Sequence, residues 1–489
     1  MVEGVAIRRG RSRTASDAIL RRWLPFLVLA AWNGAFAFAH DPSRHELQAL
    51  LIARASSGPL SLLRNLAHEG HPGLWHLLLL AALSLYDHTL VLNLLQALVA
   101  TAILALIWLA SPFGTGEKAL LSLGYYLAFE YAIPAPGYGL GVALFLAAVA
   151  CRRSAWAWLM LGLMANVGIH FMALAAIFGA LLLYQGQRSR PGIALASALA
   201  ALAVVTAYPA ADTIVATQAP GAGLRALLSL ARLSSALLPM AMPWPFGFRW
   251  SEACPGCGGL APLVLGAAVL VLGTLSLRER PALLAAFLAS AAALFLVGAA
   301  IYLGYDRHYG LLFVVLVGLN WMAREETPRR RASAVFLGWI TVSAAVGLWA
   351  AYAYFPAHGS NGRAAAEWLA SHAEDNAVVA VYPGWMGISI AAYLGKPVYN
   401  LQARRYQSYV VWNYAADARP TGDDLGTWLE AAPRTGPLYF VSDADPAAST
   451  LDESEIARLE AVGVELTEVA RFARGGEGYA LYRVRFKNG

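Results

Sequence analysis

Five long apolar runs constrain this 489-residue chain more than any other feature; they cover residues 88–110, 191–209, 260–277, 281–301 and 332–355. Each has about 18 to 24 residues, and a helix of about 20 apolar residues crosses the roughly 30 Å hydrocarbon core of a bilayer. Only 13% of the residues are charged, whereas soluble domains average about 25%. The runs exclude a soluble globular protein and predict a polytopic α-helical membrane protein.

Basic residues gather in short segments between the apolar runs. The net charge of +6 and the pI of about 9.2 would suit a nucleic-acid partner. The arginines, however, follow the positive-inside pattern of cytoplasmic turns. Their clusters are Arg152 with Arg153, Arg188 with Arg190, Arg278 with Arg280, and Arg324 with 329–331. The charge therefore encodes topology, and we expect no nucleic-acid binding.

Placing these clusters in the cytoplasm predicts about 11 spans, with the N-terminus inside and the C-terminus outside. The spans are expected at 23–40, 88–110, 118–132, 137–151, 154–168, 170–185, 191–209, 260–277, 281–303, 309–323 and 332–355. The first run lacks a small-residue cleavage site, so we interpret 1–22 as a cytoplasmic tail rather than a signal peptide. The expected location is the bacterial cytoplasmic (inner) membrane.

Two segments depart from the simple pattern of spans. In the first outer loop, 41–87, the apolar run 74–85 is too short for a routine span, so we expect in-plane juxtamembrane helices there. After residue 355 the composition is that of a soluble domain. Strand-like and helical stretches alternate in it, which predicts a small periplasmic α/β domain over 356–489, following a transmembrane domain over 23–355.

Cys254 and Cys257 lie in the expected outer loop 210–259. Oxidising conditions outside the cytoplasm favour a disulfide between them. A redox centre would need a thioredoxin-like context, and a zinc site would need two more ligands. A structural disulfide is therefore the preferred interpretation.

Polar residues of the membrane domain gather at the outer ends of spans. Two clusters lie in the first outer loop: His40, Asp41, Arg44, His45 and Glu46, then His68, Glu69, His71 and His76. Helix capping is the structural alternative for the first cluster. Transporters place ionisable residues near the middle of spans, so this pattern instead favours a site at the outer membrane boundary.

Two more polar groups are expected at the same boundary. Glu130 ends the third span, where an unpaired carboxylate would be costly, and an interhelical ion pair is its structural alternative. Asp306-Arg307-His308-Tyr309 joins two spans, where arginine suits an anionic phosphate and interfacial anchoring is the alternative. A carboxylate that deprotonates a hydroxyl, beside an arginine that stabilises a leaving phosphate, suits sugar transfer from a lipid-phosphate carrier.

The sequence resembles the GT-C class of membrane glycosyltransferases, particularly protein O-mannosyltransferase and aminoarabinose-transferase-like members. In that family an acidic pair follows the first span, and then come "YxxIAR" and "HPPLYYLL" motifs. The corresponding stretches here end in Ile52-Ala53-Arg54 and begin with His71-Pro72-Gly73-Leu74-Trp75. The resemblance implies inverting transfer of a sugar from a polyprenyl-phosphate donor to an acceptor hydroxyl at the periplasmic face, the acceptor being a glycolipid, a glycan or a protein.

The resemblance also implies roles for individual residues, although aligning the "IAR" motifs puts His45 at the family's catalytic aspartate. Either Asp41 or Glu46 is then the base, with Asp41 favoured, and Glu130 orients the acceptor. A divalent cation (Mg or Mn), which some relatives require, would use Asp41 and Glu130. The family's arginine in the second loop is missing, so donor phosphate would bind Arg307, His308 and Arg249. Further substrate contacts are expected from His45, His68, Glu69, His71, Tyr138 and Tyr309.

Two other functions fit part of this pattern. A lipid-linked polysaccharide polymerase or ligase would also act at this face, but it relies on arginine pairs in large outer loops, and arginine is sparse in 210–259. A non-enzymatic lipid-linked-sugar transporter or flippase is the other alternative. The scarcity of charge within the spans argues against ion coupling.

Overall fold

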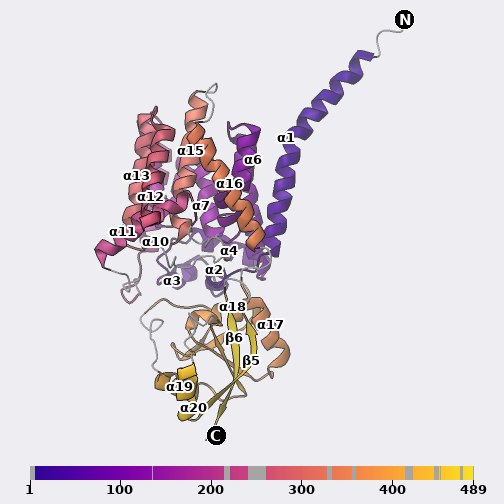
Figure 1. Ribbon diagram of the computed structural model, residues 1–489, viewed down its shortest axis with the longest axis vertical. Coiled ribbons are helices and arrows are strands. Elements are labelled where there is room, and N and C mark those ends of the chain that lie inside the picture. Colours follow the sequence, from indigo (N-terminus) through magenta and orange to yellow (C-terminus); the bar gives the residue numbers. More distant parts are fainter. Residues whose placement is uncertain are drawn as a thin grey trace.

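The computed structural model describes residues 6–134, 136–213, 221–239, 260–327, 333–354, 360–413, 422–444, 451, 453–473 and 477–487. It has three layers along its long axis (Figure 1). A bundle of long helices occupies one end, short helices α2 to α4 form a middle layer, and a domain with a β-sheet occupies the other end. The two chain termini lie at opposite ends of the molecule.

Within the described residues, five helical segments are long and apolar enough to cross a membrane. They are Leu90–Ala110 (α5 with η1), Arg190–Ala207 (α10), Leu260–Leu277 (α12), Pro281–Ala300 (α13) and Ala334–Tyr354 (α16). A sixth candidate is the bent pair Trp23–Ala39 and Arg44–Arg54. These helices confirm a largely helical membrane protein, while the full number of about 11 spans stays a prediction.

The remaining predicted spans correspond to shorter or extended helices. The first begins earlier than expected, because α1 continues through the basic tail without a break. The bounds are Ala6–Ala39 (α1), Thr115–Leu123 (α6), Tyr125–Glu130 (η2), Pro136–Ala150 (α7), Trp156–Ala165 (α8), Ile169–Tyr184 (α9), Asp306–Tyr309 (α14) and Leu311–Glu326 (α15). The segment between α10 and α12 contains Ala222–Arg232 (α11) and Leu233–Ala236 (η3). Arg249 and the predicted disulfide Cys254–Cys257 lie outside the described residues.

The third predicted span is broken at Gly124, whose backbone is extended (ψ 142°) between α6 and η2. Helix α16 packs against this break through Gly347, where a side chain would overlap the carbonyl oxygen of Leu123 and the backbone nitrogen of Tyr125. Glycine is needed at this position because the two backbones approach each other without room for a Cβ atom.

Replacing Gly347 by alanine is therefore expected to destabilise the protein by about 1–3 kcal/mol, the range for overpacking a close contact. Gly338 lies on the same helix, and a Cβ atom added there would meet nothing within 4 Å, so Gly338→Ala is the matched control. Thermal unfolding in detergent measures both variants. Equal melting temperatures for the two would show that the α16 contact is not tightly packed.

Ion pairs connect the turns at the end of the bundle farthest from the sheet domain. Arg324 bonds Glu117 at 2.8 Å and Arg280 bonds Glu326 at 2.9 Å. Arg152 pairs with Glu325. A recess of about 400 Å³ lies here as well, lined by Arg152, Arg153, Gln185, Gly186, Gln187 and Glu326. The segments predicted to be cytoplasmic thus come together at one end of the bundle.

The middle layer consists of α2 (Arg44–Arg54), α3 (Pro59–Asn65) and α4 (Leu74–Leu85). Its apolar core joins the two ends of the molecule, because Leu47, Leu50 and Trp75 pack in one cluster with Ile388 and Val410 of the sheet domain. Figure 1 places these short helices between the bundle and the sheet. The predicted in-plane position at a membrane surface stays a prediction.

The small α/β domain expected at the C-terminus is present. Its six strands are Val378–Val381 (β1), Val398–Asn400 (β2), Arg405–Gln407 (β3), Leu438–Ser442 (β4), Val464–Phe472 (β5) and Tyr479–Phe486 (β6), in the order β3-β2-β1-β4-β6-β5. The pairs β1–β2 and β1–β4 are parallel, and the others are antiparallel. The helical elements are Gly362–His372 (α17), Gly384–Met386 (η4), Gly387–Leu394 (α18), Gly422–Glu430 (α19) and Glu453–Ala461 (α20).

Candidate functional site

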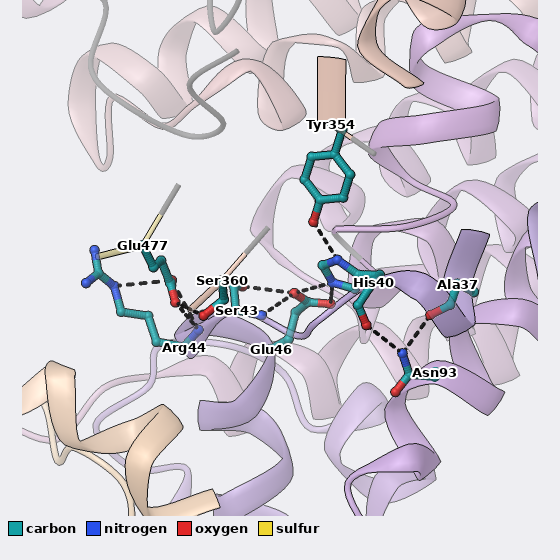
Figure 2. Close-up of polar contacts among 9 residues, drawn as sticks. All are labelled: Ala37, His40, Ser43, Arg44, Glu46, Asn93, Tyr354, Ser360 and Glu477. Carbon is teal, nitrogen blue, oxygen red and sulfur yellow. Dashed lines mark hydrogen bonds and ion pairs between the residues drawn. The ribbon is translucent and has the colours of Figure 1, made fainter. Parts of the chain in front are cut away.

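The turn between α1 and α2, residues 40–46, is called the α1–α2 corner below; the two helices meet there at 81°. Ser43 caps α2, and Glu46 three residues later completes a capping box. The carboxylate of Glu46 accepts hydrogen bonds from the Ser43 backbone nitrogen (2.8 Å), the Ser43 hydroxyl (2.9 Å) and His40 Nε2 (2.9 Å), as Figure 2 shows. Glu46 is only 5% exposed, so its main role here is to fix the corner.

The other side of His40 anchors the corner to the bundle. Its Nε2 lies 3.0 Å from Glu46 Oε1, and its Nδ1 shares a hydrogen bond with the Tyr354 hydroxyl at 2.5 Å. The amide of Asn93 donates to the carbonyl oxygens of His40 (3.0 Å) and Ala37 (2.6 Å). All these groups are buried, and together they hold the chain in one conformation at the start of α2.

Asp41 has a more open environment than Glu46. A quarter of its side chain is exposed (25%), and its Oδ1 lies 3.0 Å from Nε of Arg363 on α17. The phenol of Tyr354 interacts electrostatically with Asp41, Glu46 and Glu130. The three acids predicted as catalytic are therefore within electrostatic range of one tyrosine, and Asp41 has the most accessible carboxylate of the three.

Glu130 ends η2 and is 3% exposed. It accepts a hydrogen bond from the Tyr125 hydroxyl at 3.0 Å. Tyr125 also interacts electrostatically with Asp306 of α14. Glu130 and Asp306 thus both act electrostatically on Tyr125.

The short helix α14 presents Arg307 beside an aromatic surface. The Ser235 hydroxyl donates to Asp306 at 2.6 Å, and the Tyr131 hydroxyl donates to the Arg307 carbonyl oxygen at 2.6 Å. The guanidinium of Arg307 lies 6.0 Å from the ring centre of Tyr138 and 5.3 Å from that of Tyr305. These contacts fix the backbone of α14, so the position of the arginine is well defined.

His308 and Tyr309, the two residues that follow Arg307 on α14, are buried. Burial, with the charges of His170 and Arg307, holds the pKa of His308 well below its usual value, so its ring is neutral. Its Nδ1 accepts from the Tyr305 backbone nitrogen at 2.7 Å, which leaves Nε2–H as a single neutral donor. Tyr309 donates to the Leu303 carbonyl oxygen at 2.9 Å and packs inside the bundle. Among these residues Arg307 supplies the permanent positive charge.

Residues of the first loop lie close to Arg307. Desolvation, together with the smaller effects of the Arg307 and Arg44 charges, lowers the pKa of His45 to about 3. The pKa of His71 is also lowered, by burial and then by Arg307. Yet both imidazoles keep an exposed surface. His45 and His71 are thus accessible residues within electrostatic range of Arg307.

Glu69 lies in a polar bridge between the first loop and the sheet domain. It accepts from Gln48 Nε2 at 2.7 Å, and the same nitrogen donates to the Val410 carbonyl oxygen at 2.7 Å. Desolvation raises the pKa of Glu69 from 4.5 to about 7, against the opposing hydrogen bond from Gln48. At neutral pH this carboxyl group is therefore partly protonated.

The raised pKa predicts how stability depends on pH. The folded protein binds more protons at Glu69 than the unfolded chain between about pH 4.5 and 7, so ionising it costs stability as pH rises through that window. Glu69→Gln should flatten this fall and raise stability at pH 8 by up to about 3 kcal/mol. Unfolding measured from pH 5 to 8 tests this, with the exposed Glu460→Gln as control. An unchanged slope in Glu69→Gln would contradict the prediction.

His68 pairs with an acid outside the first loop. Its Nε2 is 2.9 Å from Asp212, which is 57% exposed, and the pair links the first loop to the segment after α10. Several residues around the site were missed by the sequence reasoning: Gln48, His170, Tyr354, Arg363 and Glu477. The tyrosine and His170 carry a detectable signal, a polar group at the outer end of an expected span. Arg363 and Glu477 carry none, because they come from the distant sheet domain.

The arrangement does not fit a bound divalent cation. Among the described residues, no three His, Cys, Asp or Glu side chains are grouped to hold a metal ion. Asp41 faces the cation Arg363, and Glu130 accepts from a tyrosine. The proposed Asp41 and Glu130 metal site therefore lacks a third ligand of these types, and no step below uses a metal.

No family model matches the sequence, and no curated protein matches it. Among solved structures, the chain is similar to the arabinofuranosyltransferase AftD from Mycobacteria, with 14% sequence identity and a TM-score of 0.35. The alignment covers 95% of this chain and 41% of AftD, so this chain spans less than half of that protein's length. Similarity at this level leaves the function to be inferred from the residues themselves.

Proposed function

We propose that this protein is an integral membrane glycosyltransferase that moves a sugar from a polyprenyl-phosphate donor to an acceptor hydroxyl. The observation that carries the proposal is that a carboxylate and a cation are both found at one end of the bundle. Asp41 supplies an accessible carboxylate, and Arg307 supplies a fixed cation whose charge reaches His45 and His71 of the first loop. The resemblance of the first loop to GT-C enzymes supports the same reaction.

In the proposed reaction, Asp41 accepts the proton of the acceptor hydroxyl as its oxygen attacks the anomeric carbon. The bond between that carbon and the phosphate oxygen breaks on the opposite face, which inverts the configuration. The electron pair leaves with the polyprenyl phosphate, whose charge Arg307 stabilises. His45, His71 and Tyr138 provide neutral donors and an aromatic surface for the sugar, and Glu130 orients the acceptor.

The proposed topology puts this site at the periplasmic face of the bacterial inner membrane. The basic turns gather at the end of the bundle opposite the sheet domain, which suits the positive-inside rule. A lipid-linked donor would then reach the site from the outer leaflet.

The test is a transfer assay with purified protein in lipid nanodiscs and a panel of short-chain polyprenyl-phosphate sugars, together with mass spectrometry of envelope glycolipids and glycoproteins from a deletion strain. We expect one donor to be consumed with release of polyprenyl phosphate. Growth of a single lipid-linked glycan chain would instead indicate a polymerase. Movement of an intact lipid-linked sugar across the bilayer, without bond cleavage, would indicate a flippase and refute the proposal.

A further inference from the structure

The sheet domain makes a buried polar contact with the first residue of α2. The carboxylate of Glu477 accepts from the Arg44 backbone nitrogen at 3.2 Å and lies 3.5 Å from Arg44 Nε. The Ser360 hydroxyl donates to the same carboxylate at 2.8 Å (Figure 2). The first backbone N–H groups of a helix lack partners within the helix. Glu477 therefore caps α2 from a domain more than four hundred residues away in the sequence.

Two acids, one within α2 and one from the sheet domain, bind backbone nitrogens at the start of α2. Glu46 binds the backbone nitrogen of Ser43, and Glu477 binds that of Arg44, the next residue. Glu477 is 7% exposed, so loss of its carboxylate would leave the Ser360 hydroxyl and the Arg44 backbone N–H without this acceptor. The direction in which the chain enters α2, and thus the position of Asp41 just before it, depends on both acids.

A second contact reaches Asp41 directly. Arg363, in the first turn of α17, places Nε 3.0 Å from the Asp41 carboxylate, and its guanidinium lies 5.2 Å from the ring centre of Tyr393. The aromatic ring limits where the guanidinium can lie, and the guanidinium in turn restricts the rotation of the carboxylate. Asp41 is thus oriented by a residue of the sheet domain.

The domain is held in this position by more than ion pairs. Ile388 and Ala392 of α18 pack in the same apolar cluster as Leu47 of α2. Gln48 exchanges two hydrogen bonds with the backbone of Val410, accepting from its nitrogen at 3.0 Å and donating to its oxygen at 2.7 Å. Apolar packing and paired backbone bonds define one docked arrangement, in which Arg363 and Glu477 reach the corner.

We propose that the C-terminal domain completes the active site: Glu477 and Arg363 are positioning residues that hold the α1–α2 corner and the Asp41 carboxylate, so that transfer requires the docked domain. The proposal rests on the glycosyltransferase function proposed above. It gives the domain a part in the reaction through the position of Asp41. Neither residue needs to contact the sugar.

The experiment compares Glu477→Gln, Arg363→Ala and Arg363→Lys in the full-length protein in nanodiscs. The control is Arg483→Ala, which removes an exposed ion pair with Glu374 inside the same domain. One arm measures kcat, KM for the donor and the stoichiometry of donor binding. The other arm measures hydrogen exchange of the amides in residues 40–47, which needs no knowledge of the substrate.

We expect Glu477→Gln and Arg363→Ala to lower kcat at least tenfold, with donor KM within twofold and full donor stoichiometry. Arg363→Lys should recover most of the activity, and Arg483→Ala should match the wild type. In Glu477→Gln the amides of 40–47 should exchange at least tenfold faster. If Arg363→Ala lost activity by misfolding, the stoichiometry of donor binding would fall instead, and Arg363→Lys would not restore the activity.

Two results would overturn the proposal. Wild-type kcat in both Glu477→Gln and Arg363→Ala would show that the domain does not position the base, while leaving the glycosyltransferase function intact. Unchanged exchange of 40–47 in Glu477→Gln would show that Glu477 does not hold the corner, whatever the reaction is. If the wild type transfers no sugar from any donor, the proposed function fails. Hydrogen exchange of residues 40–47 then decides by itself whether Glu477 holds the α1–α2 corner.

Discussion

Replacing Asp41 by asparagine should lower the turnover of sugar transfer by about 10²–10⁴, the contribution of a positioned general base. Asparagine keeps the size of the side chain and can still accept from Arg363, but it cannot take up a proton. Since Asp41 lies outside the hydrogen-bond network of Glu46, the corner should stay folded. Turnover with a polyprenyl-phosphate sugar, measured together with the melting temperature, checks both statements.

Glu46→Gln is the informative comparison for this variant. The carboxylate of Glu46 accepts three hydrogen bonds from two residues, and a glutamine amide nitrogen would face donors instead of accepting from them. We therefore expect both lower turnover and a lower melting temperature in Glu46→Gln, whereas Asp41→Asn loses turnover alone. If both variants keep wild-type turnover, the assignment of the base is wrong. If only Glu46→Gln loses turnover without losing stability, Glu46 is the base.

Replacing Arg307 by alanine should weaken donor binding by about 10- to 100-fold, since a hydrogen bond to a charged group contributes about 1.5–3 kcal/mol. Turnover should fall as well, because the leaving phosphate loses its stabilising charge. Arg307→Lys should recover only part of the affinity, because an ammonium group cannot form the same bidentate contact. Titration of a non-hydrolysable polyprenyl-phosphate sugar analogue measures the affinities.

Two further measurements make the role of Arg307 specific. Arg458→Ala, in an exposed pair with Glu455, is the control and should bind the donor normally. The neutral state of His308 adds an expectation about pH: its pKa lies well below 6.5, so donor affinity should not fall as pH rises from 6 to 8. A tenfold fall over that range would show that a protonated histidine binds the phosphate. Unchanged affinity in Arg307→Ala would exclude the arginine.

Local patterns predicted much of the fold correctly. A long apolar run predicts a helix by its length alone, because the bilayer sets the length that a span needs. The arginines beside a run predict its orientation in the same local way. The alternation of strand-like and helical stretches after residue 355 also predicted the α/β domain. The strand β3 has only three residues and pairs at a sheet edge, so its sequence carries little signal. The break at Gly124 was missed because it exists only where α16 packs against it.

For the candidate site, too, part was predictable from the sequence and part was decided only by the tertiary structure. The sequence by itself determined that scarce polar residues such as Asp41, Glu130 and Arg307 lie at or near the ends of helices, since charge is excluded from apolar spans. The tertiary structure decided how they are used: Glu46 is occupied by His40 and Ser43, and Asp41 faces Arg363 of the C-terminal domain. Contacts between residues hundreds of positions apart depend on how helices and domains pack, and no local pattern in the sequence encodes that packing.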